Sequence, residues 1–233
     1  MMLLFKAWLE SRTRFLLSVA GLAGLSIVFV IFNHDVRAAY TDRDLTYADY
    51  IFRAIFKGHL RDIFVVLALM LGMGGLERER AFGTAAFTLA LPIGRWRFTA
   101  ARGLAGVVET AVLALLPAVL TPALSPLVHE SYSWAQALQF AGLWTGGGIL
   151  IFAIGFLASV LFAGEYSAPI AAIALLFGYS FAADLPGAER YIVDVHDTMN
   201  GTGPHGFKTL ASLAFTALTM MALTACVTAK KDY

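Results

Sequence analysis

Residues 76–97 read LERERAFGTAAFTLALPIGRWR, an apolar run enclosed by two charged clusters. The first cluster, Glu77 to Arg80, holds four consecutive charges, which would cost on the order of 10 kcal/mol in hydrocarbon. The second cluster begins with Arg95 and Arg97. As a helix, the apolar run AAFTLALPI covers only about 13 Å, whereas a bilayer core is ~30 Å thick. The run therefore cannot cross a membrane and needs another explanation.

Local signals predict a short helix over about 83–92. Gly83-Thr84 is typical of a helix start with Thr84 as the cap, and Pro92 followed by Gly94 is typical of a helix end. An apolar helix of this kind would be an unexplained hydrophobic patch in water. We therefore expect it to lie against a partner protein or in the membrane interface.

The composition indicates an all-α integral membrane protein with one transmembrane domain over 1–233. The chain is 59% hydrophobic and only 14% charged, whereas soluble domains carry about 25% charge. Six apolar segments predict six transmembrane helices, at about 15–32, 61–76, 103–124, 138–163, 167–183 and 207–228. The second and fifth are short for the roughly 20 residues that a crossing needs. The second reaches that length only if Arg61, Asp62 and the Glu77–Arg80 cluster extend it into both interfaces.

The distribution of Lys and Arg predicts that both termini lie in the cytoplasm. An even number of crossings puts both termini on one side, and that side holds ten of the 17 Lys and Arg residues. The expected location is the cytoplasmic (inner) membrane, with residues 83–92 inside the cell. The outer loops are expected at about 33–60, 125–137 and 184–206.

Two amphipathic stretches flank the first segment. Lys6, Glu10 and Arg14 repeat every four residues and so share one helix face, while Leu4, Phe5, Trp8 and Leu9 take the opposite face. This pattern predicts an interfacial "elbow" helix over about 2–14, or simply the start of the first span. Arg53, Lys57 and Arg61 form a second stripe, typical of an outer interfacial helix or of the upper end of a long second span.

No catalytic motif is found in the printed sequence. It contains no GxxxxGK[ST], HExxH, GxSxG or CxxC pattern. Asp194, His196 and Asp197, with His205 further on, are residue types that bind metals, and a membrane-embedded enzyme using this loop is one alternative. Their spacing is not diagnostic of a metal site, so we expect a solvated polar loop, with no metal and no catalytic residue.

Glu109 is a carboxylate well inside a predicted span. A charge at the centre of a membrane helix costs about 2.5–3.5 kcal/mol. Glu109 must therefore face the bundle, pair, become protonated or lie near the interface. It is a candidate for the substrate pathway, and a stand-alone secondary transporter or channel with Glu109 as its ion-coupling site is a second alternative.

The residues around 77–97 resemble the permease subunits of type-2 ATP-binding-cassette transporters, which are mostly exporters. That family has an acidic-basic cluster after its second span, then Gly-Thr, a short apolar helix, Leu-Pro and an Arg-rich run. Here these are Glu77–Arg80, Gly83-Thr84, Phe87–Ala90, Leu91-Pro92 and Arg95-Trp96-Arg97. The elbow helix, the six spans and a short basic tail, AKKDY, resemble the family more weakly.

The resemblance implies a non-catalytic membrane subunit that needs no cofactor of its own. The helix at 83–92 would be the coupling helix, which docks on a separate ATPase subunit that binds the ATP. A second permease, identical or homologous, would complete the unit in the lipid membrane, and no nucleic acid is expected as a partner. Ala85-Ala86 stand where the family often has an acidic residue. The implied docking residues are Glu77, Arg80, Gly83, Thr84, Phe87, Leu89, Leu91, Pro92 and Arg95.

Overall fold

The computed structural model describes residues 2–38, 45–73, 94–162, 166–187, 192–201 and 207–230. All regular structure in these ranges is helical. Four helices are long and apolar enough to cross a membrane. They are α1 (Met2–Ile31), α7 (Arg95–Leu124) with the short η2 (Ser125–Val128) at its end, α8 (Trp134–Leu161) and α11 (Phe207–Lys230). The chain is therefore a membrane-embedded helical protein, as its composition predicts.

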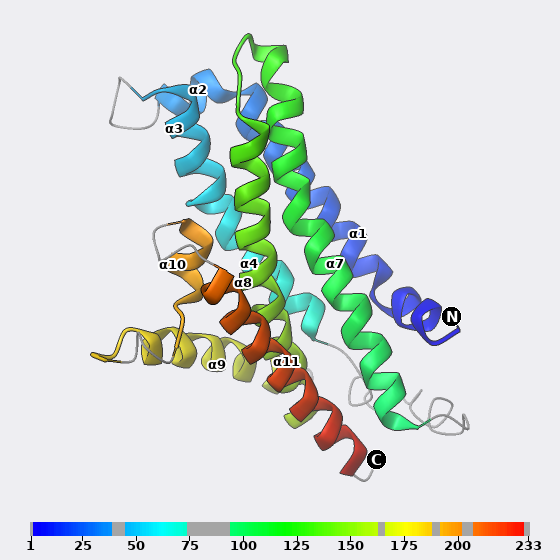
Figure 1. Ribbon diagram of the computed structural model, residues 1–233. Coiled ribbons are helices and arrows are strands. Elements are labelled where there is room, and N and C mark those ends of the chain that lie inside the picture. Colours follow the sequence, from blue (N-terminus) through cyan, green and yellow to red (C-terminus); the bar gives the residue numbers. More distant parts are fainter. Residues whose placement is uncertain are drawn as a thin grey trace.

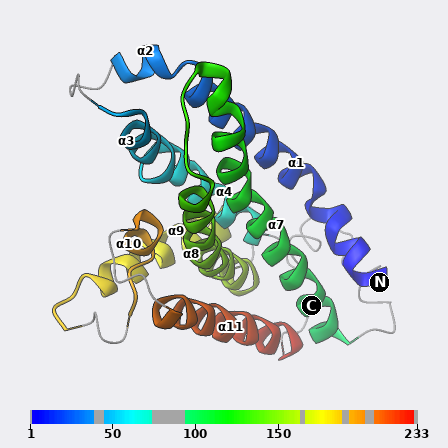
Figure 2. The same ribbon diagram turned by 45° about the horizontal axis from the view of Figure 1, so that its top comes forward.

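Helix α7 lies between α1 and α8 (Figures 1 and 2). The predicted elbow at 2–14 and the predicted span at 15–32 are one continuous helix in α1. The buried face of α1 carries small polar residues, Ser11, Ser18 and Ser26 among them. Small side chains let two membrane helices approach closely, which explains how α1 packs along α7.

The second segment forms a helix that ends earlier than expected, whereas the helix of the fifth has the predicted bounds, 167–183. Helix α4 (His59–Gly72) has 14 residues and α9 (Ser167–Ala183) has 17. Helix α4 ends four residues before the predicted end at 76, with Met73 as its C-cap. Figure 1 shows α9 running outward from the end of α8, away from α1 and α7.

The region expected as an outer loop at 33–60 is mostly helical, in agreement with the helix predicted from the stripe of Arg53, Lys57 and Arg61. It contains α2 (Asn33–Ala38), α3 (Tyr47–Ile51) and the π-helical turn η1 (Phe52–Phe56). The reason is that its large apolar side chains are packed in the core, with Tyr50, Ile51, Ile55 and Phe56 almost fully buried. Together α3, η1 and α4 span residues 47–72, broken only near Gly58.

The other two outer loops also differ from their expected extent. Helix α8 begins at Trp134, so the connection after η2 covers only residues 129–133. The expected loop at 184–206 contains a short helix, α10 (Val195–Asn200). Asp194 caps α10 by accepting from the backbone N–H groups of His196 and Asp197.

Helix α8 is the centre of the packing, because α4, α7, α9, α10 and α11 all contact it. Two glycines on α8 show how close the neighbours come. A Cβ at Gly148 would lie 2.6 Å from the Phe64 ring of α4, and a Cβ at Gly155 would lie 2.6 Å from the Leu69 backbone oxygen. The helix axes can approach this closely only where no side chain intervenes. The backbones of α4 and α8 are therefore in direct contact.

Gly155→Ala should destabilise the protein because the new methyl group would meet backbone, which cannot move aside as a side chain can. We expect a loss of roughly 1–3 kcal/mol, measured by thermal unfolding in detergent. Gly142→Ala is the matched control on the same helix, since a Cβ there would meet nothing within 4 Å. The control should be neutral or slightly stabilising, because Ala favours helices over Gly. Equal behaviour of the two variants would contradict the close contact.

Candidate functional site

Most of the predicted docking residues lie outside the described residues. These are Glu77, Arg80, Gly83, Thr84, Phe87, Leu89, Leu91 and Pro92. The two remaining predicted site residues are both in α7: Arg95 opens the helix and is half-buried, and Glu109 is buried near its middle. The structure therefore describes the residues on either side of the segment 74–93 and not the segment itself.

Charged side chains of α1 and α7 pair along the line where the two helices pack. Arg102 of α7 donates to Glu10 of α1 at 2.8 Å, and Lys6 lies 3.6 Å from the other Glu10 oxygen. Lys6 also lies 4.9 Å from the centre of the Phe98 ring. We call Lys6, Glu10, Ser11, Arg14, Arg102 and Glu109 the charged cluster. Because Arg102 is only 8% exposed in its side chain, its charge depends on Glu10 for compensation.

The charged face of α1 points into the protein and its apolar face points outward. The shared face predicted for Lys6, Glu10 and Arg14 agrees with the Lys6–Glu10 ion pair and with the contacts of Arg14. The opposite face is exposed, with Phe5 at 62% and Trp8 at 41%. An amphipathic helix on the surface of a soluble protein turns its apolar face inward and its charged face toward the solvent. This arrangement suits a helix surrounded by lipid, where charges are least costly inside the protein.

Glu109 joins the charged cluster through Ser11. It is only 4% exposed, and the Ser11 hydroxyl donates to its Oε1 atom. Its Oε2 atom is buried and has no hydrogen-bond partner among the described residues. A long side chain on a helix leans toward the helix N-terminus, which brings the Glu109 carboxyl toward the level of Arg102. The structure thus places Glu109 in the charged cluster, and no sequence pattern predicted Ser11 as its partner.

Arg14 connects α1 to the end of α4. Its guanidinium donates to the backbone oxygens of Met73 and Met70, the latter at 3.1 Å. The last carbonyls of a helix have no partners within the helix and carry partial negative charge. Arg14 therefore satisfies the end of α4 from a neighbouring helix. Nothing in the spacing of Arg14 predicts this contact, because its acceptors are backbone atoms 56 and 59 residues away.

These contacts hold to one face of α1 the helices that precede and follow the segment 74–93. Arg14 holds the last turn of α4 just before the segment, and Glu10 holds Arg102 in the second turn of α7 just after it. The first turn of α7 also carries Arg95 and Arg97. Basic residues at a helix N-terminus oppose the helix dipole, so these two residues do not stabilise α7 through its dipole. Arg97 lies 5.9 Å from the ring of Trp96, which is 58% exposed.

The polar residues near the other end of the chain were considered as metal ligands in the sequence. Within the described ranges no group of three or more His, Cys, Asp or Glu side chains converges. Asp194 is occupied as the N-cap of α10, and His205 lies outside the described residues. Asp194, one of the residues considered as a metal ligand, thus has a structural role as a helix cap.

Comparison with known proteins assigns no family to this chain. No protein-family model matches it, and no curated protein matches it either. Its function therefore has to be inferred from its own residues. Of these, the charged cluster is the most unusual arrangement, because it puts several charges at the contact between two membrane-length helices.

Glu10→Gln and Arg102→Gln should each destabilise the protein by roughly 1.5–3 kcal/mol, because each removes one charge from a charge-assisted hydrogen bond. The double variant should lose less than the sum of the two, with a coupling energy of about 0.5–3 kcal/mol. Thermal or denaturant unfolding in detergent measures all three. Arg12→Gln is the control, since Arg12 is exposed on the same helix and should change stability by no more than about 0.5 kcal/mol. Strict additivity would show that the ion pair contributes nothing.

Proposed function

We propose that this chain is a non-catalytic membrane subunit of an ATP-driven exporter, built like the type-2 ATP-binding-cassette permeases. A separate ATPase subunit would bind and hydrolyse ATP and would dock on residues 83–92. The observation that supports this most is the anchoring of both ends of the segment 74–93 on α1, by Arg14 and by Glu10. The docking partner is inferred to be an ATPase because the motif at 77–97 resembles the coupling segment of these permeases.

The anchoring matters because a docking segment must pass its displacement on to the membrane helices. If its ends were loosely attached, movement of the ATPase would be absorbed locally. Here the preceding helix α4 and the following helix α7 both pack on α8, and both are held to α1 by charged groups. A displacement of the segment would therefore move α1, α4 and α7 together. Packed interfaces of this kind switch between discrete arrangements.

The proposal needs six crossings, with two of them made by short or broken helices. The second crossing would combine α3, η1 and α4, whose residues 47–72 extend about 39 Å if helical throughout. The fifth would be α9, whose 17 residues extend about 26 Å and match a locally thin bilayer. Both termini would lie in the cytoplasm, with residues 2–14 at the inner interface.

The working unit would contain two permease copies and two ATPases. Substrate would move along the interface between the permeases, with alternating access driven by the ATPases. The apolar character of the spans favours a lipophilic or amphipathic substrate. Trp96, Arg95 and Arg97 at the start of α7 would add a basic aromatic surface beside the docking segment.

A secondary transporter is the second candidate, and Glu109 is the observation that favours it. Glu109 is buried within a membrane-length helix, and its Oε2 atom has no partner in the part of the chain that the structure describes. Intramembrane carboxylates commonly serve proton or ion coupling. Against this, its Oε1 atom accepts from Ser11, which gives Glu109 a structural contact between α1 and α7.

Leu89→Asp should abolish copurification of the chain with its ATPase. The partner to test is the product of a neighbouring open reading frame that contains GxxxxGK[ST]. A carboxylate in the middle of the apolar run would have to be desolvated on docking, which costs several kcal/mol without a counter-charge. The measurement is the amount of ATPase recovered with the tagged chain from detergent extracts.

The matched control is Leu127→Asp. Leu127 lies at the opposite end of α7 and is 69% exposed, so the same substitution there should leave the association intact. Both variants should express and elute like the wild-type chain. If the ATPase stays bound to Leu89→Asp, docking does not occur through this run, and loss of binding in both variants would show that the charge acts on folding.

Glu109→Gln separates the two candidate functions. Under the main proposal the amide still accepts from Ser11, so assembly and ATP hydrolysis of the reconstituted complex should stay near wild type. Under the rival, vesicles with this chain alone should show a proton flux down a pH gradient that Glu109→Gln removes. Glu109→Ala should lower stability by about 1 kcal/mol in either case, because the hydrogen bond between α1 and α7 is lost while Ser11 can still donate to the Ala7 backbone oxygen. A pH-sensitive dye inside the vesicles reports the flux.

A further inference from the structure

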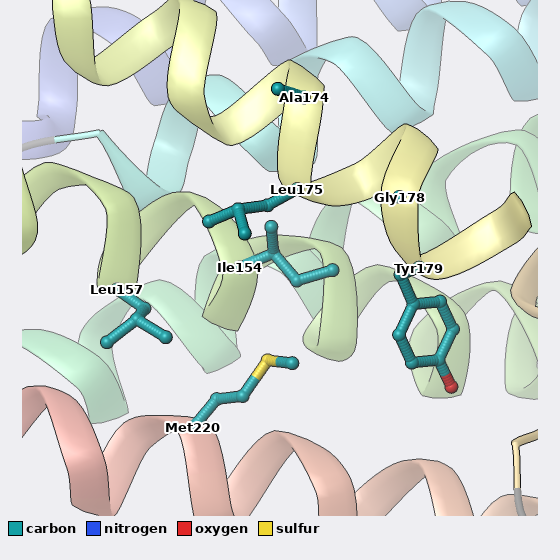
Figure 3. Close-up of a pocket in the computed structure, with 7 residues that line it drawn as sticks. All are labelled: Ile154, Leu157, Ala174, Leu175, Gly178, Tyr179 and Met220. Carbon is teal, nitrogen blue, oxygen red and sulfur yellow. The ribbon is translucent and has the colours of Figure 1, made fainter. Parts of the chain in front are cut away.

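Helices α8, α9 and α11 line a partly open apolar cavity of about 290 Å³. Both α9 and α11 pack on α8, which forms the floor between them. Figure 3 shows Met220 reaching from α11 toward Ile154 of α8, with residues of α9 closing the other side. The lining residues are Ile154, Leu157, Ala174, Leu175, Gly178, Tyr179 and Met220.

The cavity offers nothing to which water could bind through a side chain. Its one polar lining side chain is Tyr179, whose hydroxyl donates to the Val193 backbone oxygen at 2.9 Å. A buried water needs two to four polar partners, and apolar cavities without them stay dry. An empty space of this size also loses dispersion contacts along its whole lining. The cavity therefore suits an apolar occupant.

The small residues of α9 create the space. Ala174 and Gly178 are one helical turn apart and so lie on the same face, where both line the cavity. A Cβ at Gly178 would meet no atom within 4 Å. Any larger residue at this position would project into open space.

The cavity lies among surfaces that face lipid. The neighbouring side chains of α9 and α11 are strongly exposed, with Phe177 at 71% and Phe215 at 73%. Helix α11 is long enough to cross the membrane, and only 17% of its apolar 18-residue stretch is buried. Ile154 and Leu157 lie in the second half of α8, so the cavity falls within the length of a membrane-spanning helix. Hydrocarbon chains are thus the molecules in contact with its rim.

We propose that this cavity is a binding site for one acyl chain of a membrane phospholipid. An engineered cavity of about 150 Å³ holds one benzene molecule, so a space about twice as large accommodates roughly a dozen carbon atoms. A chain entering between α9 and α11 would contact Ile154 on the floor and Met220 on the wall. It would fill the space that remains between these two helices. The inference is independent of the proposed transport function.

Photolabelling tests the site in the full chain. The protein is reconstituted into phosphatidylcholine vesicles containing a small fraction of phosphatidylcholine with a diazirine in its acyl chain. After irradiation, mass spectrometry maps the labelled residues. Ile154, Leu157 or Met220 should be labelled several-fold more than Leu115 and Val119, two exposed residues of α7. Equal labelling at both places would overturn the proposal, because it would indicate ordinary lipid contact.

Gly178→Leu should lower labelling of the lining several-fold by filling the cavity, while labelling of α7 should not change. Gly142→Leu is the matched control, because Gly142 is also exposed and a Cβ there also meets nothing within 4 Å. Ala174→Leu tests the same point if Gly178→Leu does not fold. Unchanged labelling in a folded filling variant would contradict the proposal.

Two further outcomes would identify a different occupant. Diazirine-labelled stearic acid that reacts at the lining where the phospholipid probe does not would overturn the phospholipid assignment in favour of free acyl chains. Chemical cross-links from these residues to a second copy of the chain, in place of lipid adducts, would show that the copy fills the cavity. Protein dilution in lipid separates this case, since lipid labelling should persist when copies are far apart.

Discussion

A charged side chain within the membrane is stabilised by an opposite charge in the same protein. The charged cluster provides such pairs where α1 contacts α7. Each such charge would cost about 2.5–3.5 kcal/mol at the centre of an isolated membrane helix. Lys6, Glu10 and Arg14 consequently turn inward, and Glu10 meets Arg102 of α7. This pairing sets the register of the two helices, since a shift of one residue would move the charges apart.

The same cluster determines how the remaining helices relate to α1. Arg14 reaches the last carbonyls of α4, and Ser11 reaches Glu109 in the middle of α7. Both α4 and α7 then pack on α8, where Gly148 and Gly155 allow close approach. In the proposed transporter, this is the physical link between the docking segment and the membrane helices. The segment would be held at both ends by one rigid surface.

A cavity interrupts the packing around α8 between two of its neighbours. Helices α9 and α11 both contact α8, but their outer faces are exposed and a cavity remains between them. Hydrophobic burial provides little driving force between helices already surrounded by lipid, so membrane helices associate through close packing and polar contacts. The small-residue and charged contacts of α1, α4, α7 and α8 supply both. The cavity between α9 and α11 is lined by apolar side chains with the small residues Ala174 and Gly178, which leaves room for a lipid chain.

The sequence by itself determined the membrane character and most of the long helices. The predicted spans 103–124, 138–163 and 207–228 fall within α7, α8 and α11 to within two residues, because helix formation and transfer into lipid depend on each segment's own residues. It also determined that Lys6, Glu10 and Arg14 share a face, which follows from the helical repeat. The docking segment at 83–92 rests on the sequence alone.

The tertiary structure decided that the face of α1 with Lys6, Glu10 and Arg14 turns into the protein, where it contacts α7 and the end of α4. Ser11 and Glu109 are 98 residues apart, and the acceptors of Arg14 are backbone atoms of α4, so no local pattern encodes either contact. The stripe of Arg53, Lys57 and Arg61 indicated a helix before α4, but it could not show that the apolar side chains beside it are buried. That burial depends on contacts with helices distant in the sequence.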